Sequence, residues 1–148
     1  MKFAGFLAAL TALAISTIAL SADRATRDEA KAYCAKAAAH YRDIGAVKAF
    51  ADFQTPAWRD RDLYVLGVSN DGIQVVHGAN PAMVGRNVID MRDVDGKLTN
   101  REMLAVKEEG WVEYQWHNPV SGSVEAKATY VIRVSPDTIL AVGAYKPN

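Results

Sequence analysis

Residues 63–77 read LYVLGVSNDGIQVVH, and this stretch decides the fold. Its first part, residues 63–68, is apolar and rich in strand-forming side chains. The NDG triplet at residues 70–72 is a hairpin signal, because its glycine accepts the positive φ that the turn requires. Residues 73–77 then return as a second strand. The sequence therefore predicts an antiparallel strand pair in the middle of the chain.

Helical patterns precede this hairpin. Thr26 and Glu29 fit a capping box at the start of a long helix, and apolar residues then recur at helical spacing until Gly45. A second, shorter helix is predicted over residues 46–53. Residues 58–62, which read WRDRD, are predicted to form a polar turn that leads into the hairpin.

One more helix and three more strands are predicted after the hairpin. Residues 78–95 form an irregular loop, and Thr99 with Glu102 predicts another capping box, from which a short helix runs to Gly110. The further strands are predicted at residues 111–117, 124–134 and 138–145. Hairpin connections imply an α+β architecture, with a five-stranded antiparallel sheet, a long N-terminal helix and shorter helices. This order of elements resembles the PAS-like sensor folds.

The composition fits a single domain and excludes several classes of partner. The chain has 148 residues, half of them apolar, and a formal charge of zero. A core can therefore form without disulfides, and nothing indicates nucleic acid or an anionic membrane surface as a partner. The lone Cys34 has no CxxC or metal-ligand pattern beside it. Its alanine-rich helical surroundings indicate a small buried hydrophobe rather than a reactive thiol.

The first 21 residues have the pattern of a secretory signal peptide. Lys2 begins a long apolar stretch, and Ala19 and Ser21 occupy the positions that small residues take before a cleavage site. Cleavage there would leave a single domain at residues 22–148, which we expect in the periplasm. The alternative is an uncleaved N-terminal membrane anchor, because the stretch approaches the roughly 20 residues that a spanning helix needs.

Several short motifs occur in an order that is typical of one family. They include DGIQVVHGANP from residue 71 and GWVEYQWHNP from residue 110, together with VGRN, DVDGK and KATYV. Over about the whole mature chain, these motifs resemble the single Cache domains of type 2, an extracytoplasmic branch of the PAS-like sensors. Two positions depart from the family. Gly78 stands where the family usually has Pro, which would loosen the loop that follows, and Arg86 stands where it often has Lys.

The resemblance implies a sensory role. Such domains usually lie outside the membrane in chemoreceptors and sensor kinases, and many recognise small organic acids. No second membrane helix and no kinase module follows before Asn148. We therefore expect a free-standing periplasmic domain, with a separate membrane receptor or kinase as its partner. The alternative is a ligand-free protein-interaction or structural module of the cell envelope.

Polar side chains among the apolar strands indicate a site for a small anion. Lys127 lies in a predicted strand and is either a charge at an exposed edge or an internal anchor for the anion, and the resemblance favours the anchor. Tyr114 and Trp116 lie two apart and so point to one face, where they form either core or pocket wall. Tyr64 has the same two alternatives.

His77 and Arg86 complete the set of candidates. His77 ends a strand and is either a satisfied polar residue or a donor to the ligand, in which case affinity depends on pH near its titration. Arg86 either reaches the ligand or pairs with Asp90 or Asp93. The predicted ligand-binding residues are Tyr64, His77, Arg86, Tyr114, Trp116 and Lys127.

Metal and catalytic sites are not indicated. Asp93, Asp95, Gly96 and Glu102 match four positions of an EF-hand loop, but Met91 stands where the first carboxylate is required, so the segment is better interpreted as a turn. The three histidines have no carboxylate at the spacing of a zinc site. Motifs of serine hydrolases, metalloproteases and P-loop proteins do not occur. We therefore expect no cofactor, and binding rather than catalysis.

Overall fold

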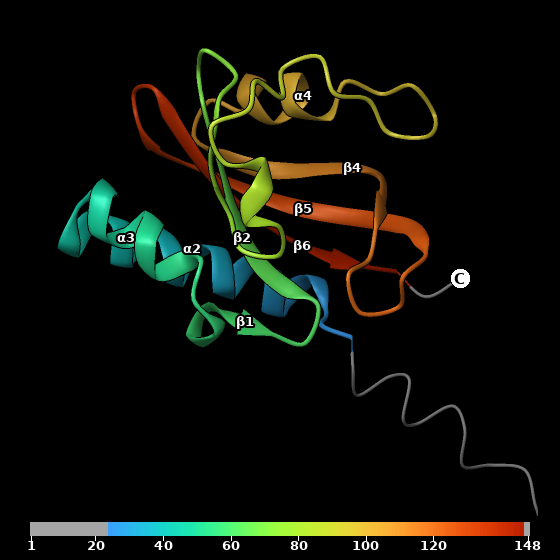
Figure 1. Cartoon of the computed structure of the whole chain (residues 1–148), viewed down its shortest axis with the longest axis horizontal. Helices are drawn as coiled ribbons and strands as arrows, with labels where there is room; N and C mark the ends of the chain where they lie inside the picture. The colour runs from blue at the N-terminus through green and yellow to red at the C-terminus, as the bar shows by residue number, and fades with distance from the viewer. Residues whose placement is uncertain (1–23, 147–148) are drawn as a thin grey trace, which may run out of the picture.

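The structure is a computed structural model that describes residues 24–146 (Figure 1). The predicted signal peptide at residues 1–21 lies outside this range. Among the described residues, no helix is both long and apolar enough to cross a membrane. The helices are α2 (Arg27–Ile44), α3 (Ala46–Phe53) and α4 (Thr99–Ala105), with two 3-10 helices, η1 (Pro56–Trp58) and η2 (Pro81–Met83). The strands are β1 (Arg59–Asp60), β2 (Leu63–Ser69), β3 (Gln74–His77), β4 (Glu109–His117), β5 (Val124–Ser135) and β6 (Thr138–Tyr145).

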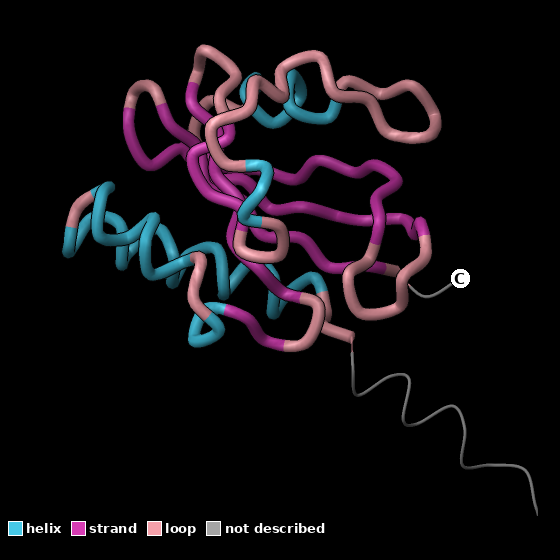
Figure 2. The backbone as a smooth tube through the Cα atoms, in the orientation of Figure 1, coloured by secondary structure: helices cyan, strands magenta, loops and turns pink. Residues whose placement is uncertain are grey.

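The strands pair antiparallel in the order β1-β2-β6-β5-β4, with β3 also paired with β2 (Figure 2). Because β6 lies between β2 and β5, the last strand of the chain lies beside the central hairpin. The predicted α+β architecture and its five antiparallel strands are confirmed, and the short β1 is a sixth strand. The predicted polar turn at residues 58–62 is wrong in part, since the backbones of Arg59 and Asp60 pair with Tyr64 and Leu63 and form the short strand β1.

Helix α2 covers one face of the sheet with small residues. The predicted capping box is confirmed, because the backbone N–H of Glu29 donates to Thr26 Oγ1 at 3.2 Å and that of Thr26 donates to the Glu29 carboxylate at 2.7 Å. Gly45, with a φ of 84°, ends the helix as predicted. Burial raises the pKa of the Cys34 thiol to about 12, so the thiol is unreactive at neutral pH. The buried residues that pack against the sheet are Ala30, Cys34, Ala37 and Ala38.

Helix α4 is shorter than predicted and is capped differently. Leu98 precedes it without a side-chain cap, and the Glu102 carboxylate pairs with Lys97 at 3.0 Å. The predicted capping box is therefore wrong, because its threonine lies within the first turn rather than before it. The helix also ends at Ala105 rather than at Gly110, since the next residue is already extended and the chain then enters β4.

The carboxylate of Asp93 organises the turn that precedes α4. One oxygen accepts the backbone N–H groups of Asp95 at 3.0 Å and Lys97 at 2.8 Å, and the other accepts that of Gln115 on the edge strand β4 at 3.0 Å. Interpretation of this acidic segment as a turn is thus confirmed. Within residues 24–146, no group of three or more His, Cys, Asp and Glu side chains could hold a metal ion.

Candidate functional site

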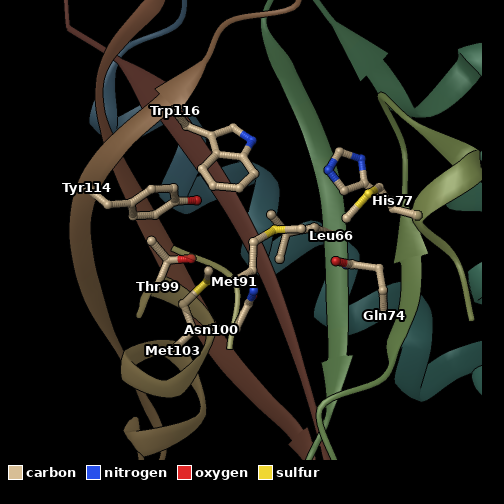
Figure 3. Close-up of a pocket in the computed structure, with 10 residues that line it drawn as sticks. Leu66, Gln74, His77, Met91, Thr99, Asn100, Met103, Tyr114 and Trp116 are labelled. Carbon is tan, nitrogen blue, oxygen red and sulfur yellow. The ribbon is translucent and has the colours of Figure 1, made fainter. Parts of the chain in front are cut away.

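Two adjacent cavities that share four lining residues lie on the face of the sheet opposite α2, beneath α4, η2 and the loop between them, and Figure 3 shows the inner one. The inner cavity has a volume of about 20 Å³ and the outer cavity one of about 490 Å³. Both are lined by His77, Met83, Met91 and Trp116. The inner cavity is also lined by Leu66, Gln74, Thr99, Asn100, Met103 and Tyr114. The outer cavity is also lined by Tyr64, Ala79, Asn80, His117 and Pro119.

Lys127 is a buried cation behind the wall of the outer cavity. Its side chain is 1% exposed, and its Nζ donates to the Tyr64 hydroxyl at 2.8 Å. The ammonium also lies 4.3 Å from the centre of the Tyr64 ring and 4.7 Å from that of Tyr145. None of the ion pairs formed by the described residues includes it. A buried charge without a counter-ion is expensive, so this cation is unusual for a residue that serves only packing.

The tyrosines around Lys127 keep it charged. Burial on its own lowers the pKa of Lys127, but the phenolic oxygens of Tyr114, Tyr64 and Tyr145 outweigh it and raise the pKa above the ordinary value for lysine. The ammonium is therefore protonated throughout the neutral range.

Gly143 makes room for the lysine side chain. Lys127 is paired with Tyr145 on the neighbouring strand β6, and Thr129 is paired with Gly143. A Cβ atom at Gly143 would lie 2.2 Å from Lys127 Cε and 2.4 Å from Thr129 Oγ1. Because glycine has no side chain, Lys127 can lie across β6 and reach Tyr64 on β2.

A directed chain of hydrogen bonds runs from Lys127 to the end of β4. The Tyr145 hydroxyl donates to the backbone oxygen of His117 at 2.8 Å, so its own oxygen is left to accept from the Tyr64 hydroxyl at 3.3 Å. Tyr64 in turn accepts from Lys127. Tyr64 and His117 line the outer cavity, so a single tyrosine side chain separates the Lys127 ammonium from that cavity.

His77 presents a donor to both cavities. Its Nδ1 accepts the backbone N–H of Asn80 at 3.0 Å, which leaves the proton of the neutral ring on Nε2. Burial, and then the charge of Lys127, lower the pKa of His77 to about 4, so the ring is neutral at physiological pH. The ring stacks on Tyr64 with 5.1 Å between ring centres. The adjoining loop is held firmly, because the N–H of Gly78 donates to Val65 O at 2.8 Å, a bond that Pro could not make.

Tyr114 and Trp116 point to the same face, as predicted, and both line the inner cavity (Figure 3). Their rings meet edge to face, with 5.9 Å between the centres. The Tyr114 hydroxyl accepts from Thr129 Oγ1 at 3.0 Å, so its own proton is free to bind a further acceptor. These aromatic residues form cavity wall rather than closed core.

Arg86 lies apart from the other candidates. Its side chain is exposed and lines neither cavity. Arg86 pairs with neither Asp90 nor Asp93, because Asp90 binds Arg101 at 2.6 Å and Asp93 binds backbone N–H groups. The backbone oxygen of Arg86 accepts from Gln74 N–H at 2.9 Å, which holds this part of the loop along the edge of β3.

Several cavity residues were not anticipated from the sequence. Loop and α4 side chains become neighbours only after folding, and no sequence pattern marks them as cavity lining. They are Met83, Met91, Thr99, Asn100 and Met103, together with Gln74 on β3.

An antiparallel sheet with a long helix on one face and an aromatic, donor-lined cavity on the other defines a PAS-like domain for binding small molecules. Comparison with known families agrees, and the chain belongs to the single Cache domain 2 family, which matches residues 8–146. Members of this family are extracytoplasmic sensor domains, and they bind ligands rather than catalyse reactions.

A curated relative is a sensor kinase, and solved structures of the same fold include a chemotaxis protein. The sensor histidine kinase MctS of Rhizobium johnstonii is 25% identical over 139 residues, which are 92% of this chain and 27% of the kinase, so the chain spans about a quarter of that relative's length. A methyl-accepting chemotaxis protein from Vibrio parahaemolyticus has the same fold, with a TM-score of 0.71 and 22% identity, over 80% of this chain and 87% of its own.

Two further solved structures share the fold. A periplasmic sensor domain of a chemotaxis protein superposes with a TM-score of 0.64 and 23% identity, over 89% of this chain and 99% of its own. A Cache chemosensory domain, solved to explain its carboxylic acid recognition, superposes with a TM-score of 0.63 and 22% identity, over 81% of this chain and 88% of its own.

Proposed function

We propose that this domain binds a small organic acid in the periplasm and that Lys127 supplies the compensating positive charge. The observation that carries the proposal is the buried, protonated Lys127 that has no carboxylate partner among the described residues. A bound carboxylate would offset the free-energy cost of this charge. Carboxylic acid recognition by a Cache domain of the same fold supports this assignment.

The charges around the cavities favour acids with a single negative charge. No Asp, Glu, Lys or Arg side chain lines either cavity, and Lys127 is linked to the outer one by its hydrogen bond to Tyr64. A second carboxylate would therefore lack a second cation, and an α-ammonium group would lack a carboxylate partner. The expected ligand is a monocarboxylate rather than a dicarboxylate or an amino acid.

Five of the six candidate residues have a task in this proposal. Lys127 supplies the positive charge and Tyr64 holds it beside the outer cavity, while His77 Nε2–H and the Trp116 indole N–H donate to the carboxylate and the Tyr114 hydroxyl is a further donor in the inner cavity. The outer cavity, at about 490 Å³, falls within the range of small-molecule sites. Arg86 has no task, because it lies outside both cavities.

A thermal-shift screen tests the proposal directly. Carboxylates of two to four carbons are compared with amino acids, using protein refolded from denaturant so that no ligand is carried over. A ligand at about 100 times its Kd adds roughly 2.7 kcal/mol to the free energy of unfolding. Stabilisation by monocarboxylates is the expected result. A flat response across the whole set would contradict the proposal and favour a ligand-free interaction module of the envelope.

Export and signalling are further parts of this proposal. Cleavage after residue 21 would release the domain at residues 22–148 into the periplasm, where a membrane receptor or kinase would be its partner. The kinase and chemotaxis relatives support such an output. Mass spectrometry of the protein from a periplasmic fraction tests cleavage, and a mature chain that retains residues before Ala22 would instead support an N-terminal anchor.

A further inference from the structure

The inner cavity presents hydrogen-bond acceptors beside the donors of His77, Tyr114 and Trp116 that also line it. Gln74 is 4% exposed, and its Nε2 donates to the backbone oxygens of Gly67 at 2.9 Å and Val76 at 2.7 Å. With both amide hydrogens engaged, the orientation of the side chain is fixed. Figure 3 shows the Gln74 oxygen directed into the cavity.

Asn100 adds a second acceptor. It is 5% exposed, and its Nδ2 donates to the backbone oxygen of Val88 at 2.9 Å. Its Oδ1 is then the polar atom left for the inner cavity, which Asn100 lines together with Thr99. No donor among the described residues is engaged with either amide oxygen. Each amide oxygen is therefore open to a donor on a ligand that enters the cavity.

We infer that the inner cavity selects small acids that carry a hydroxyl group beside the carboxylate. The carboxylate lies where the two cavities join, near the donors of His77 and Trp116, and the hydroxyl donates to Gln74 Oε1 or Asn100 Oδ1. A volume of about 20 Å³ admits one group of the size of water, which matches a hydroxyl. This inference rests on the proposed function and adds the class of acid to it.

The size of the inner cavity fixes the direction in which such a ligand lies. A volume of about 20 Å³ is too small for a carboxylate group, so the charged end lies beside the donors of His77 and Trp116, which both cavities share. An ammonium group would satisfy the same acceptors, but no carboxylate lines the cavities and the buried charge of Lys127 lies nearby. Among donor-bearing substituents, the neutral hydroxyl is therefore favoured.

Three acids with the same carbon skeleton test the inference on the wild-type protein by isothermal titration at pH 7. Lactate carries a hydroxyl, propionate carries hydrogen and alanine carries an ammonium group at the same position. We expect lactate to bind about tenfold more tightly than propionate, as one additional hydrogen bond allows, and alanine to bind more weakly than both. The comparison needs no variant, so it does not depend on how a substitution folds.

Gln74→Met then tests the residue assignment. The expected result is that the ratio of lactate to propionate affinity falls toward one, because only lactate loses a hydrogen-bond acceptor in this variant. Gln115→Met is the matched control, because Gln115 lies on β4 and lines neither cavity, and it should keep the wild-type ratio. A ratio that stays at the wild-type value in Gln74→Met would overturn the role of Gln74.

The outcomes separate this inference from the proposed function. Equal binding of lactate and propionate would overturn the hydroxyl selection and leave the organic-acid site intact, with a water molecule as the occupant of the inner cavity. Preference for alanine would also overturn the inference. If none of the three acids nor any other carboxylate of the screen binds, the proposed function itself fails.

Discussion

The two faces of the sheet are built from the same strands and each buries an apolar cluster, yet they differ in the polar side chains that they bury. On β5, Tyr130 and Ile132 face α2, whereas Lys127 and Thr129 lie on the opposite face, behind the cavity walls. The face toward α2 is an apolar cluster packed against alanines. The cavity face buries an ammonium, a histidine and two carboxamides. One face therefore stabilises the fold, and the other gives up stability for polar groups that can meet a ligand.

Leu140→Ala should give the largest loss of stability, because Leu140 is fully buried on the face toward α2. Removing its side chain leaves a cavity, which costs about 2–5 kcal/mol of unfolding free energy. Urea denaturation measures this loss. The folded fraction should still bind the acid with wild-type affinity. A variant of wild-type stability, or one that stays folded but loses affinity, would contradict the division between the faces.

Acid should weaken the fold through His77. The unfolded ring takes up a proton near pH 6.5 and the folded ring only near pH 4, so stability falls as the pH drops through this window. The loss is on the order of 3 kcal/mol. Denaturation at several pH values measures it, with His77→Gln as the control that should lose this part of the slope. An unchanged slope in the variant would show that another group titrates.

Gly143→Ala should lower both the stability of the fold and the affinity for the acid. The added methyl group meets Lys127 and Thr129, so overpacking costs about 1–3 kcal/mol. Because Lys127 must also move off Tyr64, affinity for the acid should fall, unlike in Leu140→Ala. Titration of the folded variant compares the two. Wild-type affinity would mean that the route of Lys127 across β6 does not matter for binding.

Arg86→Ala should have the smallest effect. The side chain is exposed and lines neither cavity, so stability should stay within about 0.5 kcal/mol and affinity should not change. Arg86→Lys, which restores the residue common in the family, serves as the charge-retaining control. A clear loss of affinity in Arg86→Ala alone would return this residue to the site.

Local patterns in the sequence were enough to predict most of the fold. The capping box at Thr26 and the glycine at residue 45 bound α2 correctly, and residues 138–145 form β6 as predicted. The wrong predictions concern segments whose structure depends on contacts with distant parts of the chain. Arg59 and Asp60 become a strand only because β2 offers them a free edge, and α4 ends at Ala105, before the chain enters β4, rather than at the next glycine.

The site was predictable in part, through residues on strands. Alternation along β4 places Tyr114 and Trp116 on one face. The contact between Lys127 and Tyr64 could not be predicted, because it depends on β6 lying between their two strands. The sequence could not exclude Arg86 from the ligand-binding site, because the direction of a loop side chain does not follow from periodicity. The acceptors Gln74 and Asn100 were equally invisible, since their role depends on which amide hydrogens the backbone engages.

Titration of lactate and propionate into Lys127→Met tests the central claim most directly. Methionine keeps an unbranched side chain of similar length without the charge. We predict that affinity falls by about 100-fold or more for whichever acid binds the wild type, as the loss of a charged partner allows. The same variant should be at least as stable as the wild type by urea denaturation, because an unpaired buried charge has been removed. A stable Lys127→Met protein that binds either acid with wild-type affinity would contradict the claim that Lys127 anchors the anion.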